Sequence, residues 1–165
     1  MPRDFYPTPQ EAVAPLLRHL DSGTRFCEPC AGNGALIDHL TVAGHVCASA
    51  WDIEPQRADI AQHDARTRLI GNIDCFITNP PWERLTLHEL IVWLSDQHPT
   101  WLLFDADWLH TRQSAPYLSR LQRIVSVGRV KWIPGSKMTG KDNCAWYLFD
   151  KPGRTAPAFF GRLAA

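Results

Sequence analysis

The sequence has no apolar run that approaches the roughly 18 residues a transmembrane helix needs. Its first residues also lack the apolar stretch of a secretion signal. These absences predict a soluble, cytoplasmic protein. Hydrophobic residues make up 45% of the 165 residues and charged residues 21%, the balance of an ordinary globular chain. We therefore expect a single domain over residues 1–165.

Cysteine is scarce and odd in number, with five residues scattered along the chain. This count predicts reduced thiols rather than a disulfide framework. Cys27 and Cys30 form one C-x-x-C pattern, but no second C-x-x-C and no H-x-x-x-H completes a zinc site. We expect no metal site.

The formal net charge is zero, so no overall excess of one sign points to a partner. The charges are nevertheless divided along the chain. Residues 1–110 hold 7 Lys and Arg against 15 Asp and Glu, whereas residues 111–165 hold 10 against 2. The basic half indicates either a face that meets a polyanion or a solvated edge that balances the acidic half.

Short apolar runs alternate with helical patterns, which predicts an α/β fold with a mostly parallel sheet covered on both faces. The expected strands are Thr24–Glu28, Val46–Trp51, Thr67–Ile70, Ile73–Thr78, Trp101–Phe104, Ile124–Val130 and Ala145–Asp150. The expected helices are a first one capped by Thr8 that ends near Leu20, then Ala35–Ala43, Pro55–Gln62, Leu85–Asp96 and a broken stretch, Asp107–Leu121. The tail after Lys151 is expected to be irregular.

The last connection distinguishes two kinds of doubly wound sheet. Lys131–Cys144 has 14 residues, which is too short for a helical crossover, so the sixth and seventh strands are predicted to form an antiparallel hairpin. Six parallel strands with one antiparallel strand resemble the Rossmann-like plan of class I methyltransferases. A plain dinucleotide-binding domain keeps its last connection parallel.

Ligands of such sheets bind at the carboxyl ends of the strands. The first strand runs into Glu28-Pro29-Cys30-Ala31-Gly32-Asn33-Gly34, where two glycines allow a tight turn and close approach of a ligand. The third glycine of G-x-G-x-x-G and the Gly-Lys-Ser/Thr of a P-loop are both missing. An acid four positions before the first glycine suits a positively charged amino group. The alternative is an ordinary strand-to-helix turn.

The second strand ends in Asp52, 18 residues after Gly34, where an acid can accept hydrogen bonds from ribose hydroxyls. Ile53 can pack on an adenine ring, and Asp64 is the candidate for contact with the adenine amine. The alternative for Asp52 is a solvated acid before a helix.

The fourth strand ends in Asn79-Pro80-Pro81-Trp82, the most specific motif of the chain. Two prolines hold the backbone rigid, so the Asn79 amide oxygen and the Pro80 carbonyl become two fixed acceptors. Together they can hold the two hydrogens of a planar amino group, while Trp82 stacks on the ring that carries it. The alternative is a rigid turn with a core tryptophan.

With these motifs in this order, residues 4 to about 150 resemble the S-adenosylmethionine (SAM)-dependent N6-adenine DNA methyltransferases. The likeness is closest to small, stand-alone enzymes of phages and prophages. Its motifs are Asp4–Pro9, Phe26–Gly34 and Asn79–Trp82. The resemblance implies SAM as cofactor, with roles for Tyr6 and Thr8 at the methionine carboxylate, Glu28, Gly32 and Gly34 along the methionine, Asp52 at the ribose, and Asn79 between cofactor and target.

The implied mechanism needs neither a metal nor a covalent intermediate. The target adenine is flipped out of its stack. Asn79 and the Pro80 carbonyl accept hydrogen bonds from its amine and align the nitrogen with the sulfonium methyl, so catalysis is chiefly positioning and electrostatics.

Enzymes of this group usually carry a separate target-recognition region, and no segment here is long enough for one. The best substitute is the basic loop of residues 131–143, with Lys131, Trp132, Lys137 and Lys141. Since the sixth strand should run parallel to the fourth, we expect this loop beside Asn79, where it would contact phosphates. That position favours the polyanion interpretation. Recognition of DNA would be short, relaxed in sequence or directed at single strands.

Three alternatives to DNA adenine methylation stay open. The first is the same chemistry on RNA adenine. The second is methylation of a protein glutamine, which also presents a planar amide. The third is a non-catalytic subunit of this fold that binds nucleic acid only.

Overall fold

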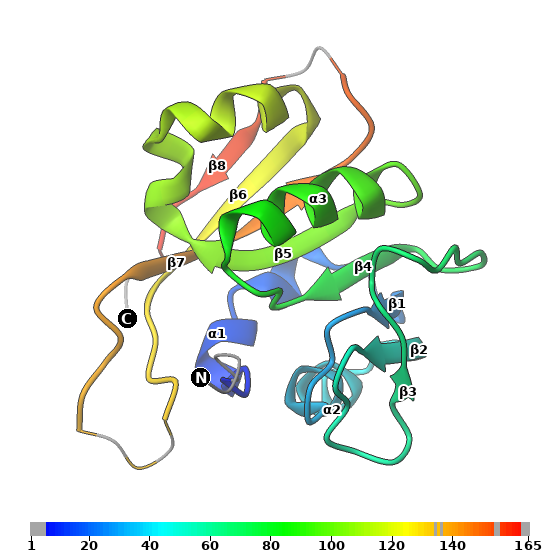
Figure 1. Cartoon of the computed structure of the whole chain (residues 1–165). Helices are drawn as coiled ribbons and strands as arrows, with labels where there is room; N and C mark the ends of the chain where they lie inside the picture. Colours follow the sequence, from blue (N-terminus) through cyan, green and yellow to red (C-terminus); the bar gives the residue numbers. More distant parts are fainter. Residues whose placement is uncertain (1–5, 134, 136, 154–155, 163–165) are drawn as a thin grey trace.

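The computed structural model describes residues 6–133, 135, 137–153 and 156–162. Asp4 and Phe5 of the first motif, Pro134 and Ser136 of the basic loop, and Arg154 of the basic half lie outside the described residues. The described part contains an eight-stranded sheet in the order β3-β2-β1-β4-β5-β7-β6-β8 (Figure 1). The strands are β1 Arg25–Glu28, β2 Val46–Asp52, β3 Ala61–Gln62, β4 Cys75–Thr78, β5 Thr100–Asp105, β6 Leu121–Arg129, β7 Asn143–Phe149 and β8 Ala158–Phe160.

Strand directions confirm the predicted hairpin. β7 runs antiparallel to both β5 and β6, whereas the other described pairs are parallel. β1 lies at the switch point, because the chain winds outward from it to β3 and then returns to its other side as β4. The parallel strands β1, β2, β4, β5 and β6 therefore end at one edge of the sheet, here called the carboxyl edge.

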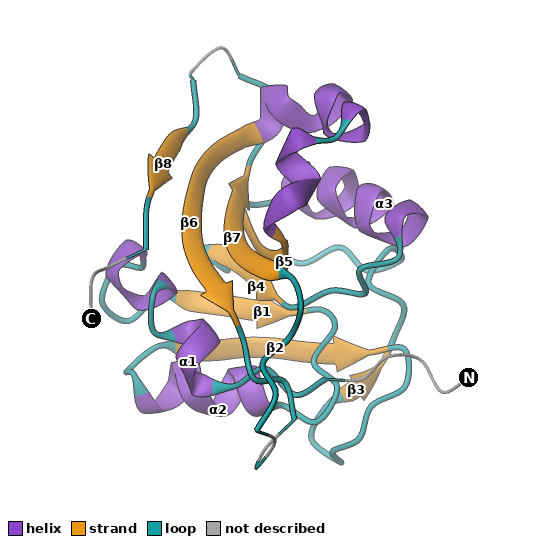
Figure 2. Ribbon diagram, turned by 90° about the vertical axis from the view of Figure 1, so that its left-hand side faces the viewer, coloured by secondary structure: helices purple, strands orange, loops and turns teal. Residues whose placement is uncertain are grey.

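Helices cover the two faces of the sheet (Figures 1 and 2). One face carries α1 Gln10–Val13, the 3₁₀ helix η1 Leu16–His19 and α2 Ala35–Val42; the other carries α3 Arg84–Ser95 and the 3₁₀ helices η2 Ala106–His110 and η3 Arg112–Arg120. In β5, Trp101 and Leu103 join the core under α1 and α2, while Leu102 and Phe104 join the core under α3. Burial on both faces explains why the strand reads as one continuous apolar run.

Helix α3 begins at Arg84, two residues after Trp82, and so fixes the end of the Asn-Pro-Pro-Trp loop. The Glu83 side chain accepts hydrogen bonds from the backbone N–H groups of Leu85 and Thr86, which caps the helix. Its buried face consists of Leu87, Leu90, Ile91 and Leu94 at helical spacing. The helix predicted at Leu85–Asp96 is therefore confirmed, and the loop before it is anchored at both ends.

The helix predicted from Thr8 to Leu20 is wrong as one element. Helix α1 has four residues, and its N-cap is Pro9, with no capping hydrogen bond from a side chain. Pro15 then follows, and because it has no N–H group it cannot continue the helical hydrogen-bond ladder. The chain resumes as the 3₁₀ helix η1.

Three further expectations need correction. No helix forms at Pro55–Gln62, because the backbone there is held otherwise: Glu54 N–H donates to Asp52 Oδ1, and Gln56 N–H donates to the Gly32 carbonyl. The strand expected at Thr67–Ile70 is absent from these described residues, and the third strand is the two-residue β3. The tail, expected to be irregular, contributes β8, which pairs with β6.

In the part of the chain that the structure describes, no helix combines the length and the apolar character that crossing a bilayer requires. Trp146, at the centre of β7, is fully buried, and its indole N–H donates to the carbonyl of Ala12 at 2.7 Å. This bond ties the antiparallel strand to α1 and so helps hold the N-terminal segment against the sheet.

Candidate cofactor and catalytic site

The first element of the site is a buried acid at the end of β1. Glu28 is only 2% exposed, and its Oε2 atom has no hydrogen-bond partner among the described residues. Burial raises the pKa of the Glu28 carboxyl well above its usual value, and the nearby Asp52 carboxylate raises it further, while Arg57 lowers it. An ionised carboxylate in such a place needs a cation beside it. The position therefore suits an ammonium group.

The glycine loop after β1 depends on a left-handed backbone. Gly32 has φ 52° and Gly34 has φ 78°, values that residues with a Cβ rarely adopt. A Cβ at Gly34 would lie 2.4 Å from the guanidinium carbon of Arg57, which rests on this glycine. The two glycines thus allow a tight turn at the carboxyl edge, and Arg57 occupies the side of Gly34 where a Cβ would stand.

Asp52 joins the loops after β1 and β2. Its Oδ2 accepts from Gly32 N–H at 2.8 Å and its Oδ1 from Glu54 N–H at 2.7 Å. Each carboxylate oxygen can accept a second hydrogen bond, so the side chain remains able to take ribose hydroxyls. Ile53 follows it and is 44% exposed at the same edge.

Asp64 is engaged differently. Its two carboxylate oxygens accept from the Arg66 guanidinium at 3.0 and 2.7 Å, and Arg66 also pairs with Glu89 at 2.6 Å. The Asp64 carboxylate therefore forms a bidentate ion pair with the Arg66 guanidinium. Its predicted contact with an adenine amine stays a prediction.

The motif after β4 contains a hydrogen bond that its residue types alone did not reveal. Trp82 Nε1 lies 3.2 Å from Asn79 Oδ1 and 3.2 Å from the carbonyl oxygen of Leu103 on β5. An indole N–H can only donate, so Asn79 must turn its oxygen rather than its NH₂ group toward Trp82. Trp82 thereby sets which way the Asn79 amide faces, and it links the loop to β5.

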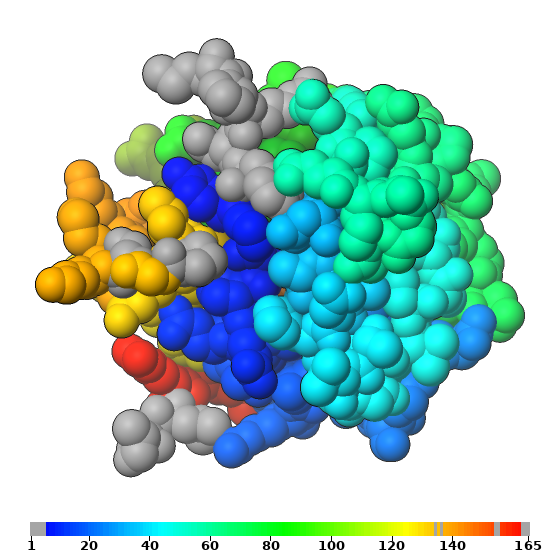
Figure 3. All heavy atoms as spheres, turned by 90° about the horizontal axis from the view of Figure 1, so that it is seen from below, coloured from blue at the N-terminus to red at the C-terminus, as the bar shows by residue number. Residues whose placement is uncertain are grey.

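The basic loop lies beside this motif, where it was expected. The Trp132 ring meets the Trp82 ring edge to face with centroids 5.8 Å apart, and the Tyr6 ring lies 6.3 Å from Trp132. Lys131 N–H donates to the Glu11 carboxylate at 2.7 Å, which fixes the start of the loop. Figure 3 shows the N-terminal residues (blue) between this loop (yellow and orange) and the region around α2 (light blue and cyan).

The other predicted residues of this region differ in burial. Thr8 is 5% exposed and packed inside, whereas Tyr6 is 47% exposed. The side chains of Lys131, Lys137 and Lys141 are exposed. The lysines are therefore accessible to a polyanion, and Trp132 of the same loop contacts Trp82 of the Asn-Pro-Pro-Trp motif.

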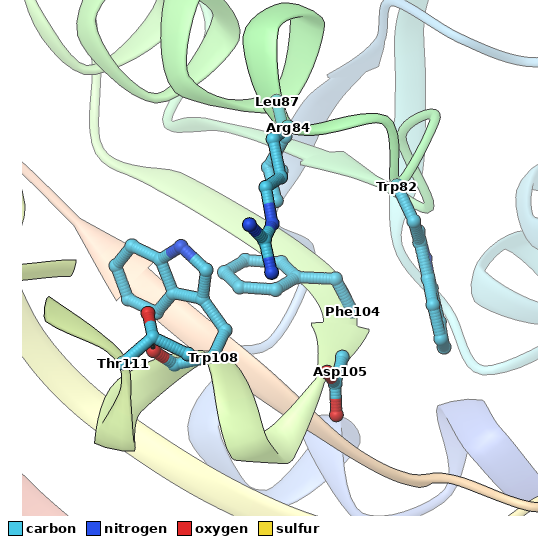
Figure 4. Close-up of a pocket in the computed structure, with 7 residues that line it drawn as sticks. All are labelled: Trp82, Arg84, Leu87, Phe104, Asp105, Trp108 and Thr111. Atoms are coloured by element: carbon cyan, nitrogen blue, oxygen red, sulfur yellow. Dashed lines mark hydrogen bonds between the residues drawn. The ribbon is translucent and has the colours of Figure 1, made fainter. Parts of the chain in front are cut away.

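A small cavity of about 60 Å³ opens beside Trp82. Figure 4 shows Arg84 reaching over the Phe104 ring, with Trp82 and Trp108 on opposite sides. The space is far below the roughly 300 Å³ or more of a typical ligand pocket. A flat base can enter only if a wall moves, and the exposed Arg84 is the most mobile type of side chain there.

Two residues of the site were missed by sequence reasoning. Asp105 lines this cavity and is the last residue of the buried strand β5, the same signal that identified Glu28 and Asp52. Arg57 lies over Gly34 and forms ion pairs with Asp38 at 2.8 Å and Asp59 at 2.7 Å. No local pattern marks Arg57 as part of the site, because Gly34 and Asp38 come from another part of the chain.

The C-x-x-C pattern has no reactive thiol. Burial raises the pKa of both the Cys27 and the Cys30 thiols far above the ordinary value, whereas redox cysteines need a lowered pKa. The carboxylates of Asp52, Glu28 and Asp64 raise the pKa of the Cys30 thiol further. The described residues bring no three His, Cys, Asp or Glu side chains into a group that could hold a metal ion.

Comparison with known proteins identifies the fold. No family model matches the sequence, and no curated protein matches it. Among solved structures, the chain is similar to a putative class I SAM-dependent methyltransferase from Listeria monocytogenes, with 10% identity and a TM-score of 0.62 over 100% of this chain and 68% of that one.

It is also similar to a putative RNA methyltransferase from Pyrococcus horikoshii, with 18% identity and a TM-score of 0.59 over 91% of this chain and 89% of that one. A third is a modification subunit of a putative type I restriction enzyme from Vibrio vulnificus, with 12% identity and a TM-score of 0.60 over 98% of this chain and 48% of that one. The chain thus spans about half of that subunit. These likenesses establish the class I methyltransferase fold, a Rossmann-like doubly wound sheet.

Proposed function

We propose that this chain is a SAM-dependent methyltransferase that transfers a methyl group to the N6 amine of adenine in DNA. One observation carries the proposal: a buried carboxylate oxygen without a partner, Glu28 Oε2, shares the carboxyl edge with an Asn-Pro-Pro-Trp loop whose amide oxygen is turned to a defined side. The first suits the ammonium end of an amino acid, and the second suits a planar amino group.

The residues present fit SAM. Glu28 would pair with its amino group, the backbone of Gly32 and Gly34 would run along its methionine part, and Asp52 would accept from the ribose hydroxyls. Thr8 and Tyr6 would help to bind the methionine carboxylate, with Tyr6 against Trp132 of the basic loop, and Ile53 offers an apolar surface for the adenine ring. When bound, SAM supplies an electrophilic methyl group; the remaining work is positioning.

Asn79 and Pro80 would hold the target amine. The Asn79 oxygen accepts one hydrogen bond from Trp82, and its second lone pair remains for a substrate N–H. Accepting both amine hydrogens keeps the nitrogen lone pair directed toward the methyl donor, which is positional catalysis. Stacking of the base on an aromatic face such as Trp82 contributes roughly 1–3 kcal/mol.

The basic half of the chain supports a nucleic-acid substrate. The basic loop places exposed lysines next to Trp132 and the catalytic motif, where phosphates of a bound strand would pass. One structural neighbour is named an RNA methyltransferase and another a restriction modification subunit, so both nucleic acids belong in the test.

Methyl transfer from radiolabelled SAM tests the proposal. Double-stranded DNA, single-stranded DNA, RNA and a protein extract serve as substrates, with Asn79→Ala as the inactive variant. We expect label in DNA as N6-methyladenine that is lost in the variant. Label only in RNA or protein would overturn the substrate, and SAM binding without transfer to any substrate would favour the non-catalytic subunit.

A further inference from the structure

A second, larger hollow lies on the face of the sheet that carries α3. It has a volume of about 330 Å³ and is here called the β6–β7 groove. Its floor is made by alternate residues of neighbouring strands, which face the same side because the side-chain period of a strand is two. These residues are Ile124, Ser126 and Gly128 of β6, Asn143, Ala145 and Tyr147 of β7, and Phe159 of β8.

One helix separates the groove from the cavity beside Trp82. A 3₁₀ helix has three residues per turn, so residues three apart share a side. One row of this helix and its flanking residues, Asp105, Trp108 and Thr111, faces the small cavity. The other two rows face the groove: Ala106 with Leu109, and Asp107 with His110. The Tyr147 hydroxyl, hydrogen-bonded at 3.1 Å to the carbonyls of Asp105 and Ala106, holds this wall in place. The groove is thus the next hollow beyond the catalytic loop.

The groove offers the groups that bind an unpaired nucleotide. Phe159 is a 67% exposed aromatic ring at its margin. The Arg162 guanidinium rests on Gly128: a Cβ at Gly128 would lie 3.0 Å from Nη1 of Arg162. The backbone of Gly128 has φ +91°, which a residue with a side chain rarely adopts. Asn143 and His110 add polar groups, and the one carboxylate, Asp107, can accept from a base amine but not from a phosphate.

We propose that the β6–β7 groove holds the nucleotide next to the target adenine on the same strand, with its base against Phe159 and its phosphate near Arg162. A strand with its target base at Trp82 would continue past η2 into a hollow with an aromatic ring and a cation. Aromatic stacking beside a cation is how proteins bind single strands. The inference rests on the proposed function and assigns substrate recognition to the methyltransferase fold itself.

The matched variants come from β6, β8 and the residues that follow β8. Phe159→Ala and Arg162→Gln alter the groove. Phe160→Ala is the control, because Phe160 is the next residue of β8, points to the opposite face and contacts the His19 ring at 4.6 Å. Arg123→Gln is the control for Arg162, since Arg123 is an exposed arginine of β6 on the His19 side. Thermal unfolding of all four checks that each variant is folded.

The assay uses short single-stranded oligodeoxynucleotides with one adenine, either intact or with an abasic site next to it. Binding is followed by fluorescence anisotropy, and methylation by kcat and KM. We expect Phe159→Ala to weaken binding of the intact strand about 5- to 150-fold, the equivalent of losing one stacked base. It should leave binding of the abasic strand and of SAM unchanged, and Arg162→Gln should weaken both strands.

Equal binding of the intact strand by wild type, Phe159→Ala and Arg162→Gln would overturn the inference, as would an equal loss in the two control variants. If wild type methylates no adenine but the groove variants still lose the intact strand selectively, the proposed function fails and the nucleotide site stands. A wild-type protein that methylates DNA while all groove variants keep their KM would leave the proposed function and remove the groove from it.

Discussion

Replacing Trp82 by Phe separates two contributions that one side chain makes. Phe keeps an aromatic face for stacking but has no N–H group, so Asn79 Oδ1 and the Leu103 carbonyl both lose their donor. The Asn79 amide can then turn its NH₂ group toward the target amine. An NH₂ group there would repel the amine hydrogens rather than accept them.

The magnitude follows from the geometry. One indole hydrogen is shared between two acceptors, each at 3.2 Å, which is longer than the usual 2.9–3.0 Å. Such a bond contributes about 0.5–1.5 kcal/mol net, so kcat should fall about 2- to 10-fold. KM for the oligonucleotide should change little, because the stacking face is retained. Trp82→Ala should in addition raise KM by about 5- to 150-fold, the cost of lost stacking.

The assay is steady-state methylation of a single-stranded oligonucleotide at saturating SAM, with Trp93→Phe as the control. Trp93 lies on α3, and its buried indole nitrogen has no hydrogen-bond partner among the described residues. Its replacement should leave kcat unchanged. If Trp82→Phe keeps wild-type kcat while only KM rises, Trp82 acts by stacking alone and does not orient Asn79.

Four other outcomes follow from the site. Because burial raises the pKa of Glu28, its carboxyl stays protonated to a higher pH than that of a free glutamate. SAM affinity, measured by calorimetry, should therefore rise as pH rises toward that raised pKa. In Glu28→Gln the affinity should no longer depend on pH in this range. The same raised pKa means that the ligand-free fold loses stability as pH rises from the ordinary glutamate value, which urea unfolding at several pH values checks. Gly34→Ala should cost about 1–3 kcal/mol of unfolding free energy, because φ +78° strains a residue with a Cβ and Arg57 must move; unchanged urea stability would contradict this. Lys137→Gln and Lys141→Gln should each lower the slope of log K against log salt for DNA by about one, at equal SAM affinity, and an unchanged slope would remove these lysines from the interface.

Much of the fold could be predicted because its signals are local. The buried strands β1, β4, β5 and β7 are apolar runs, and helix α3 has four apolar residues at helical spacing after an acid that caps it. The short connection after β6 required the hairpin, and the hairpin is present. Elements without a local signal were missed: β8 forms only because β6 offers it an edge, and the segment after Asp52 is shaped by hydrogen bonds to the glycine loop.

Which residues stand at the carboxyl edge follows from the sequence alone. Glu28 and Asp52 each end a strand, Asn79 directly follows one, and the alternating pattern dictates the strand directions. How these side chains are engaged depends on the packing of the folded chain. Packing leaves Glu28 Oε2 without a partner, pairs Asp64 with Arg66, places Arg57 over Gly34 and turns the Asn79 oxygen to Trp82. The reason is physical: the order of strands follows from local periodicity, whereas hydrogen bonds between side chains from different strands depend on distances that only packing sets.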